Sequence, residues 1–368
     1  MKIRIDRRTF ASALAEVVPF APQKAPVAIL KNAKITTKGN RMKIEANDTL
    51  CSIVKYIELI ECDEDGTFLI EASELNKFIS KTKGDAIELS IEGNTVHISH
   101  SKGTADFQSS DPAEFPVFKM PEEGVTEVTL DSAYIAEAVS NARAFISGDT
   151  LRPQMCAIYA YIKDNEFGYC ASDTCKLIHG NHPIAGVEGL DVHWFIMPPA
   201  FPTLLNACKY AESVRIQITD SHVSYRLGNI IIHTLQAKGA YPNFKRVIPQ
   251  TWNIECAVDK NDLIEALGRM SLFCDTSQCV QLDISHMDMN ISVDNILYMK
   301  SAKENVPHNG CDGDIKIGVN VNNALTSLNV FGDNVVLMRM TDASRPILFK
   351  QQDNDYLQVV AMPMSLNS

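Results

Sequence analysis

Residues Val128-Thr129-Leu130-Asp131-Ser132-Ala133-Tyr134-Ile135-Ala136-Glu137-Ala138-Val139 decide the fold, because their pattern occurs three times along the chain. An alternating strand leads to an aspartate, and apolar residues at helical spacing follow. The same pattern starts at Ile3 and at Cys256, with Asp6 and Asp259 in the place of Asp131. Each aspartate is placed to cap a helix, because its side chain can accept the free N–H groups of the first turn. Three copies at nearly equal intervals predict an internally repeated fold.

A second block recurs later in each copy, where a strand runs into a short helix and then into a hairpin. It spans residues 68–91, 194–218 and 315–340. Each copy therefore carries two helices of about three turns and several alternating strands. This composition predicts an α+β fold in which the two helices of each repeat pack on antiparallel sheets.

The repeated pattern lapses at Pro116–Gly124 and around Val247–Trp252. Proline, glycine and polar residues gather at these two places, as is usual between domains. The chain of 368 residues also exceeds what one hydrophobic core usually organises. We therefore expect three domains, over residues 1–122, 127–248 and 252–368.

Composition places the chain among folded proteins, with 45% hydrophobic and 21% charged residues. The net charge of −11 argues against a protein that grips DNA over its whole surface, because such a grip requires lysine and arginine to replace condensed counterions. A locally basic face is compatible with this net charge. An acidic surface is also compatible with a protein that stays on DNA because it encircles it.

The N-terminus and the cysteines bear on the compartment. Charged residues stand where a secretory signal needs an apolar run, and no stretch of 18 apolar residues occurs, so we expect a cytoplasmic protein without a membrane span. The ten cysteines are scattered without any CxxC pair. Reduced thiols, most of them buried, are the simplest interpretation.

Known catalytic motifs are missing from the sequence. It contains no GxxxxGK[ST] phosphate loop, GxSxG, HExxH or GxGxxG after a strand. Threefold duplication without a catalytic cluster is typical of scaffolds and binding proteins, so we expect no enzyme activity, no cofactor and no metal. The enzyme alternative is a metal-assisted hydrolase using Cys175, His179 and His182, which are ligand types that zinc accepts. One packed cysteine and two surface histidines are the plainer interpretation.

Basic side chains on or beside the six expected helices could face DNA, because phosphates recruit such groups without reading bases. Acidic residues are interspersed, so a solvated helix surface is the alternative interpretation. The candidates are Arg7, Lys77, Lys81, Arg143, Lys209, Lys260 and Arg269.

Three strings, in their order and spacing, resemble the bacterial DNA sliding clamp, the β subunit of DNA polymerase III. They are Ala171–Leu177, which resembles the family's A-T-D-x-x-R-L, Tyr241–Pro249, which resembles its F-P-x-Y-x-R-V-x-P, and Val360–Leu366. With the repeat, the resemblance extends over the whole chain.

The resemblance implies a homodimer, in which two three-domain subunits pair head to tail into a closed ring around duplex DNA. Each subunit then forms half of the ring, contacts DNA without reading its sequence, and confers processivity on the replicative polymerase. The implied partners are the polymerase III catalytic subunit, the clamp loader, and other polymerases and repair proteins with clamp-binding peptides. Positions that match the dimer interface are Phe107, Leu272 and Phe273, and Lys24 matches a DNA-facing position.

The resemblance further implies a pocket between the second and third domains that takes a short partner peptide. Apolar members such as Met155 and Met362 suit a cavity that repacks around different partners, and Arg246 and Asn320 would anchor polar groups at its rim. The matching positions are Met155, Ser172, Thr174, Lys176, Leu177, Pro242, Arg246, Val247, Asn320, Ser344, Pro346, Val360, Met362, Pro363, Met364 and Leu366.

The chain departs from the family pattern at the same pocket. Thr174-Cys175-Lys176 stands where the family often has Gly-His-Arg, and Ser365 stands where it often has arginine. Lysine does not replace arginine where a planar fork is used, so the pocket's polarity and peptide preference should differ. In the expected pore, Pro198-Pro199 occupies a place where we expected a basic residue. A peptide-binding adaptor without a DNA role is the remaining alternative.

Overall fold

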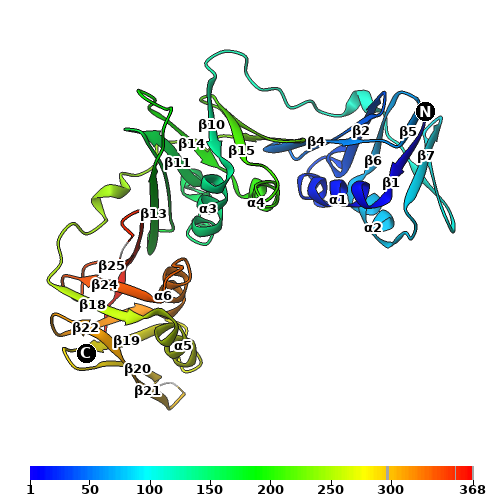
Figure 1. Cartoon of the computed structure of the whole chain (residues 1–368). Coiled ribbons are helices and arrows are strands. Elements are labelled where there is room, and N and C mark those ends of the chain that lie inside the picture. Colours follow the sequence, from blue (N-terminus) through cyan, green and yellow to red (C-terminus); the bar gives the residue numbers. More distant parts are fainter. Residues whose placement is uncertain (296–297, 353, 367–368) are drawn as a thin grey trace. The chain divides into compact units, whose positions relative to one another are not determined.

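The computed structural model describes residues 1–295, 298–352 and 354–366 (Figure 1). The chain forms two compact units, which are described separately. The first unit comprises residues 1–136 and 196–236, and the second comprises residues 137–195 and 237–368. Among the described residues, no helix is long and apolar enough to cross a membrane.

The first unit contains two antiparallel sheets. The smaller has the order β5 (Glu61–Glu64), β1 (Lys2–Asp6), β7 (Ala86–Glu92), β8 (Thr95–His100) and β9 (Gly103–Gln108). The larger has the order β10 (Thr126–Asp131), β15 (Ser213–Ile218), β16 (His222–Leu227), β17 (Ile230–Leu235), β4 (Cys51–Glu58), β3 (Arg41–Asn47), β2 (Asn32–Lys38) and β6 (Gly66–Glu71).

Helices α1 (Arg7–Val17) and α2 (Ala72–Lys81) pack against each other in the first unit (Figure 1). Phe10, Leu14 and Val17 are fully buried because their spacing places them on one face of α1. The unit also holds α4 (Phe201–Ala207) and the start of α3 (Ser132–Ala142). Its short 3-10 turns are Val18–Phe20, Ala28–Lys31, Pro112–Glu114 and Pro198–Ala200.

The second unit also contains two antiparallel sheets. The larger has the order β14 (Val192–Ile196), β11 (Ile158–Lys163), β12 (Glu166–Ser172), β13 (Lys176–Pro183), β26 (Leu357–Ala361), β25 (Ile347–Gln351), β24 (Val335–Met340), β18 (Ile254–Asp259) and β22 (His308–Cys311). The smaller has the order β21 (Lys300–Val306), β20 (Met289–Asn295), β19 (Cys279–Ile284), β23 (Ile315–Asn320) and β27 (Pro363–Met364). The unit holds the end of α3 and the helices α5 (Lys260–Ser271) and α6 (Val321–Leu328), and its 3-10 turns are Pro153–Cys156 and Phe244–Arg246.

The expected α+β architecture is confirmed, and so are the three aspartate caps. Asp6 accepts a hydrogen bond from the N–H of Thr9 at 2.7 Å. Asp131 accepts from the N–H of Ala133 at 2.8 Å, and Asp259 accepts from Asn261 at the same distance. The expected helix length of about three turns is wrong for α6, which has 8 residues, and for α4, which has 7. Prolines at 198, 199 and 202 keep its start in a 3-10 turn, because proline lacks the N–H that a helix interior uses.

Both large sheets run across the expected domain boundaries. Strand β4 pairs with β17 through partners such as Ile53 and Ile232, and β13 pairs with β26 through Leu177 and Val360. The compact units therefore divide the chain within the second expected domain. The three domains at 1–122, 127–248 and 252–368 stay a prediction, and residues 296–297, 353 and 367–368 of the third lie outside the described residues.

Candidate functional site: an apolar pocket in the second unit

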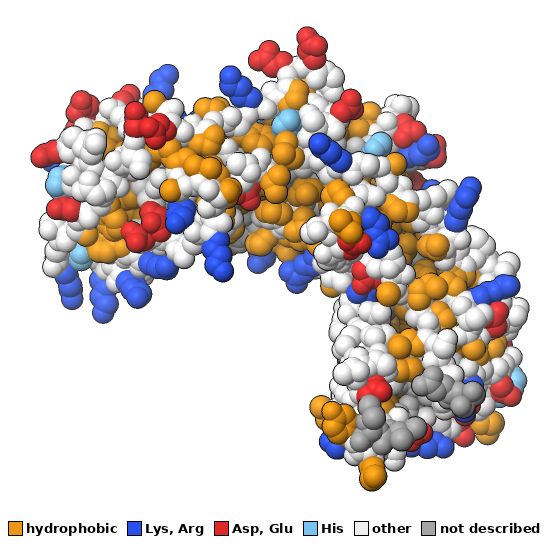
Figure 2. Space-filling model, turned by 180° about the vertical axis from the view of Figure 1, so that it is seen from behind, with side chains coloured by type: hydrophobic (Ala, Val, Ile, Leu, Met, Phe, Trp, Pro, Cys, Tyr) orange, Lys and Arg blue, Asp and Glu red, His pale blue; other side chains and the backbone are white. Residues whose placement is uncertain are grey.

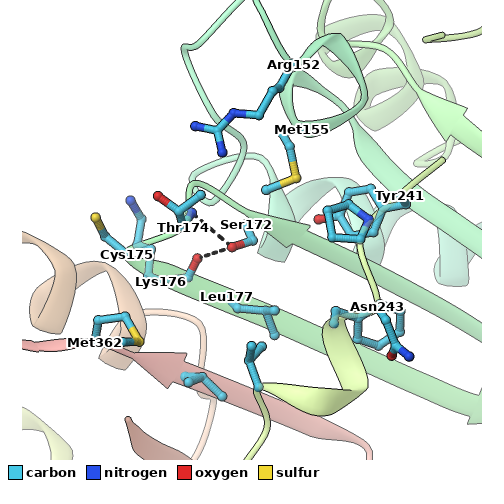
Figure 3. A pocket seen from close by; sticks show the side chains of 14 residues that line it. Arg152, Met155, Ser172, Thr174, Cys175, Lys176, Leu177, Tyr241, Asn243 and Met362 are labelled. Atoms are coloured by element: carbon cyan, nitrogen blue, oxygen red, sulfur yellow. Dashed lines mark hydrogen bonds between the residues drawn. The ribbon is translucent and has the colours of Figure 1, made fainter. Parts of the chain in front are cut away.

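The turn between β12 and β13 forms one wall of a pocket (Figure 3). The Ser172 hydroxyl accepts a hydrogen bond from the N–H of Thr174 at 3.1 Å and donates one to the carbonyl of Lys176 at 2.9 Å. The Asp173 carboxylate accepts from the N–H of Cys175 at 3.0 Å and of Lys176 at 2.8 Å. These bonds fix a tight turn in which the φ of Thr174 is +78°.

Strand β26 brings the C-terminal residues to the same pocket. Leu177 faces Val360 in the β13–β26 ladder. One residue beyond the strand, the Met362 N–H donates to the carbonyl of Cys175 at 2.8 Å. Val360 and Met362 therefore lie beside Leu177 at the pocket.

Aromatic side chains support the pocket from the segment after residue 240. The rings of Tyr159 and Tyr241 stack with centroids 4.8 Å apart. Phe244, in the turn Phe244–Arg246, joins a buried cluster with Tyr161 and Leu177. Met155 reaches the pocket from the turn Pro153–Cys156 and is 5% exposed.

The cavity has a volume of about 340 Å³. Nine expected residues line it: Met155, Ser172, Thr174, Lys176, Leu177, Pro242, Val247, Val360 and Met362. Five more were missed: Arg152, Cys175, Tyr241, Asn243 and Phe244. Four of the five lie inside the quoted strings, and the remaining one, Arg152, stands three residues before Met155.

Several expected pocket residues lie elsewhere in the second unit. Asn320 caps α6, where its side chain accepts from the N–H groups of Asn322 and Asn323 at 3.1 Å, so that oxygen is not a free rim group. Pro363 and Met364 form β27, which pairs with β23. The others outside the lining are Arg246, which is exposed in the turn Phe244–Arg246, Ser344, which bonds Asp342, Pro346, which precedes β25, and Leu366, which lies over Gly318.

The charged side chains that line the pocket form ion pairs, and the side chains at the bottom of the pocket are uncharged. The Lys176 ammonium binds the Asp173 carboxylate, and Arg152 binds Asp149 at 3.0 Å. Below the pocket, burial and the nearby Lys245 charge lower the pKa of His179 to about 4. Burial also raises the pKa of Tyr241. The arrangement suits an apolar ligand with few charges.

The metal-hydrolase alternative is not supported by the arrangement of its three residues. His179 is buried and shares a hydrogen bond of 2.9 Å with the Tyr161 hydroxyl. His182 pairs with Glu137 at 2.9 Å, while Cys175 is exposed at the pocket. Within the described ranges, no group of three or more His, Cys, Asp or Glu is placed to hold a metal ion.

The expected dimer residues lie near sheet edges. Phe107 is half-buried in the edge strand β9 and contacts Phe78 edge to face, with ring centroids 5.6 Å apart. In the second unit, Leu272 follows α5 and is 77% exposed, and Phe273 beside it is half-buried. Leu272 is therefore not a core residue of the chain alone.

Of the eight expected DNA-facing residues, three already bind other groups of the protein. Arg269 binds Glu304 through its Nε at 3.0 Å, while Arg7 donates to the carbonyl of Gly84 at 3.0 Å and Lys260 to that of Phe331 at 2.7 Å. The other five are exposed: Lys24, Lys77, Lys81, Arg143 and Lys209. Figure 2 shows lysine and arginine side chains gathered along the border of the first unit that carries α1 and α2.

Two family models match the chain. The model for the N-terminal domain of the DNA polymerase III beta subunit matches residues 1–119, and the model for the C-terminal domain matches residues 245–365. Together they span almost two thirds of the chain.

Relatives and solved structures match over nearly the full length. A beta sliding clamp of Staphylococcus epidermidis is 22% identical, with 99% of each chain covered, and one of Pseudomonas aeruginosa is 21% identical, with 100% of each covered. A crystal structure of the Pseudomonas aeruginosa sliding clamp bound to griselimycin superposes with a TM-score of 0.94 at 18% identity. The Thermotoga maritima beta subunit superposes with a TM-score of 0.92 at 18% identity, and both structures are covered completely.

Proposed function

Because the chain belongs to the DNA polymerase III beta subunits, the family of bacterial sliding clamps, we propose that it works as half of a homodimeric ring that encircles duplex DNA. The family places the chain in DNA replication as a processivity factor. We further propose that its pocket tethers the polymerase III catalytic subunit, the clamp loader, and other polymerases and repair proteins. Tethering raises the concentration of a polymerase at the primer end, so that dissociation no longer ends synthesis.

The observation that carries the proposal is the apolar cavity of about 340 Å³. Its volume falls in the range of sites that enclose a few side chains of a ligand. Met155 and Leu177 are 5% exposed at its floor, whereas Val247 and Met362 are 49% and 42% exposed at its mouth. A buried floor with an open apolar mouth suits the insertion of one or two apolar side chains from a peptide. Flexible methionines allow the mouth to repack around different sequences.

Polar rim groups would orient that peptide. Arg246 is exposed beside the lining residue Val247, and no ion pair holds it among the described residues. Lys176 is bound by Asp173, so it offers a peptide less charge than an unpaired arginine would. We expect Arg246 to be the main polar anchor, with Ser344 and Pro346 next to the bound peptide.

Two exposed sheet edges support the proposed head-to-tail dimer. Strand β9 ends one sheet of the first unit and carries Phe107, and β21 ends one sheet of the second unit. Edge strands leave backbone N–H and C=O groups free to pair with another chain. Beside β21, Leu272 is 77% and Tyr298 70% exposed, which supplies apolar surface for a second copy to cover.

Encirclement explains how an acidic protein can remain on DNA. The net charge of −11 opposes tight phosphate binding over the whole surface. Weak contacts from exposed residues such as Lys77 and Lys81 would centre the duplex without holding the ring in place. Opening the ring would be the task of the loader, and we expect the protein to act in the cytoplasm.

Loading on circular DNA tests the ring. Chain loaded by its clamp loader should remain on a closed circle through gel filtration and should leave once the circle is cut with a restriction enzyme. Retention on cut DNA, or no retention on the circle, contradicts topological linkage. Peptide binding without any retention would favour an adaptor that has no DNA role.

A further inference from the structure

The second unit contains two facing cysteines that the pocket does not use. Cys256 in β18 and Cys311 in β22 are register partners in adjacent antiparallel strands. Next to them, the N–H of Asp312 donates to the carbonyl of Glu255 at 3.1 Å. This bond between outer neighbours places the cysteines as a non-hydrogen-bonded pair, in which opposing side chains approach most closely. On the other side of the pair the register shifts, between Cys256 and Val258.

The positions of these two cysteines match the needs of a disulfide. Cα atoms of a non-hydrogen-bonded pair lie about 4.5 Å apart, and disulfides span Cα separations of about 4.4–6.8 Å. The Cys311 side chain is close enough to Cys256 to raise the pKa of the Cys256 thiol, beside the larger effect of burial. A bond between the sulfur atoms therefore requires little movement of the backbone.

We propose that Cys256 and Cys311 form a dithiol site that a low-molecular-weight disulfide, such as glutathione disulfide, oxidises to a cross-strand disulfide. The Cys311 thiolate attacks one glutathione sulfur, forms a mixed disulfide, and releases one glutathione thiolate, which takes up the proton that Cys311 lost. The Cys256 sulfur then attacks the Cys311 sulfur and releases the second glutathione, which receives the Cys256 proton. One small disulfide is reduced to two thiols, and two protein thiols are oxidised.

Exposure determines the order of these steps. Cys311 is 8% exposed in a strand of 4 residues at the sheet edge, and its thiol donates to the carbonyl of Gly313 at 3.1 Å, a bond that must break for the sulfur to turn outward. Cys256 is fully buried, and burial raises the pKa of its thiol to about 12. It is thus a poor first nucleophile. Held beside the mixed disulfide, however, it competes well with dissolved thiols.

The bond would fasten the edge strand to the strand that leads into α5. In a reducing cytoplasm both thiols stay reduced, so the bond would form under oxidative conditions. Oxidation should also raise the melting temperature, because the bond restricts the unfolded chain. Neither cysteine lines the pocket, so the proposal stands apart from peptide binding.

Mapping of disulfides in the full-length chain tests the site. The native protein is incubated with glutathione disulfide, free thiols are blocked with N-ethylmaleimide, and unreduced peptides are identified by mass spectrometry. The expected product is a linked peptide joining Cys256 to Cys311, removed by dithiothreitol. It should exceed any peptide joining Cys274 to Cys279 by roughly tenfold or more because of proximity, since the Cys274 thiol instead meets the carbonyl of Cys279 at 3.8 Å.

Exposed Cys175 serves as an internal control for the reagent. The variant Cys256→Ser should leave Cys311 as a stable glutathione adduct, and Cys279→Ser should leave the linked peptide unchanged. The proposal is overturned if Cys175 is fully modified while Cys256 and Cys311 remain alkylatable, or if each carries its own glutathione. The wild-type mapping alone decides if a variant does not fold.

Discussion

The backbone N–H of Met362 donates a hydrogen bond to the carbonyl of Cys175 at 2.8 Å, one residue past the end of β26. This bond holds the C-terminal segment against the β12–β13 turn, so both sides of the pocket mouth are fixed together. The segment then continues into β27, which pairs with β23. The C-terminal residues thus serve the pocket and the sheet at once.

Met362→Ala should weaken binding of a partner peptide without unfolding the protein. The side chain is 42% exposed, so its truncation costs little stability in the free chain, while the contact it makes with a peptide is lost. We expect a loss of about 1 kcal/mol, or roughly fivefold in affinity. Fluorescence anisotropy with a labelled clamp-binding peptide of the cognate polymerase measures it.

Met287→Ala is the matched control, because Met287 is 85% exposed in the same unit and does not line the cavity. Equal affinities for both variants would argue against this pocket as the peptide site. Deletion of residues 362–368 should abolish binding, but it also removes β27, so its melting temperature should fall as well.

Leu272→Asp should convert the dimer into monomers. The side chain is 77% exposed in the chain alone, so a charge there is tolerated in the monomer but would be buried unpaired in a dimer. Light scattering after gel filtration measures the mass. An unchanged dimer mass for the variant would exclude Leu272 from the interface, and Met287→Asp is the control.

Lys77→Ala combined with Lys81→Ala should reduce the salt dependence of DNA association. Each lost phosphate contact lowers the slope of log K against log salt concentration by about 0.9. Arg269→Ala should leave that slope unchanged, because Glu304 and Glu265 already neutralise the guanidinium. Titration of labelled duplex at several salt concentrations compares the two variants, and a larger effect for Arg269 would reverse this assignment.

The free energy of unfolding should fall as the pH is lowered from 6.5 to 4, because buried histidines take up a proton when the chain unfolds. Burial lowers the pKa of His179 to about 4, so between these values the unfolded chain binds a proton that the folded chain does not. The contribution of the uncharged His179 to the free energy of unfolding is fully present above pH 6.5 and is lost as the pH falls toward 4. About 2 kcal/mol of it is lost by pH 5. Urea unfolding at pH 7 and pH 5 measures the loss.

His179→Gln should remove the His179 part of this pH dependence, because glutamine can keep the bond to the Tyr161 hydroxyl without titrating. Burial also lowers the pKa of His233 to about 4, so its part should remain. His97→Gln, which changes a half-exposed histidine in the first unit, is the control. A pH dependence that is the same in His179→Gln as in the wild type would show that His179 is already protonated in the fold.

Asp259→Ala should destabilise the second unit by about 1 kcal/mol, because two N–H groups at the start of α5 lose their acceptor. Asp262→Ala is the control in the first turn of the same helix, since the capping oxygen comes from Asp259. Urea unfolding of the two variants should differ, and equal stabilities would contradict the capping role.

The repeated fold could be predicted from the sequence because its signals are local. An aspartate before an apolar helical run predicts both the cap and the start of the helix, and all three caps were found. The length of α4 was predicted wrongly because the helical spacing of Phe201 and Leu204 does not reveal how far neighbouring prolines delay the helix. Pairing between distant strands, such as β4 with β17, leaves no local signal.

The pocket was predicted less completely, because its walls depend on which side chains other elements already use. Asn320 was expected at the rim, although an asparagine before a helical run also predicts an N-cap, and the cap is what forms. Tyr241 and Phe244 stand in the quoted string Tyr241–Pro249 but were not predicted to line the pocket, and in the structure they serve both core and pocket. Ser172 and Thr174 were predicted from the resemblance of Ala171–Leu177 to the family string, and in the structure a local turn brings them to the pocket.

The β4–β17 ladder has a consequence for the segment 116–124. Residues 51–58 and 230–235 are joined by backbone hydrogen bonds, and Ile53 and Ile232 face each other within them. The parts of the first unit before and after segment 116–124 are therefore held together by strand pairing, and the covalent link adds little to this association. A chain nicked there by a protease should purify as one particle, and its two fragments, produced separately, should reassemble.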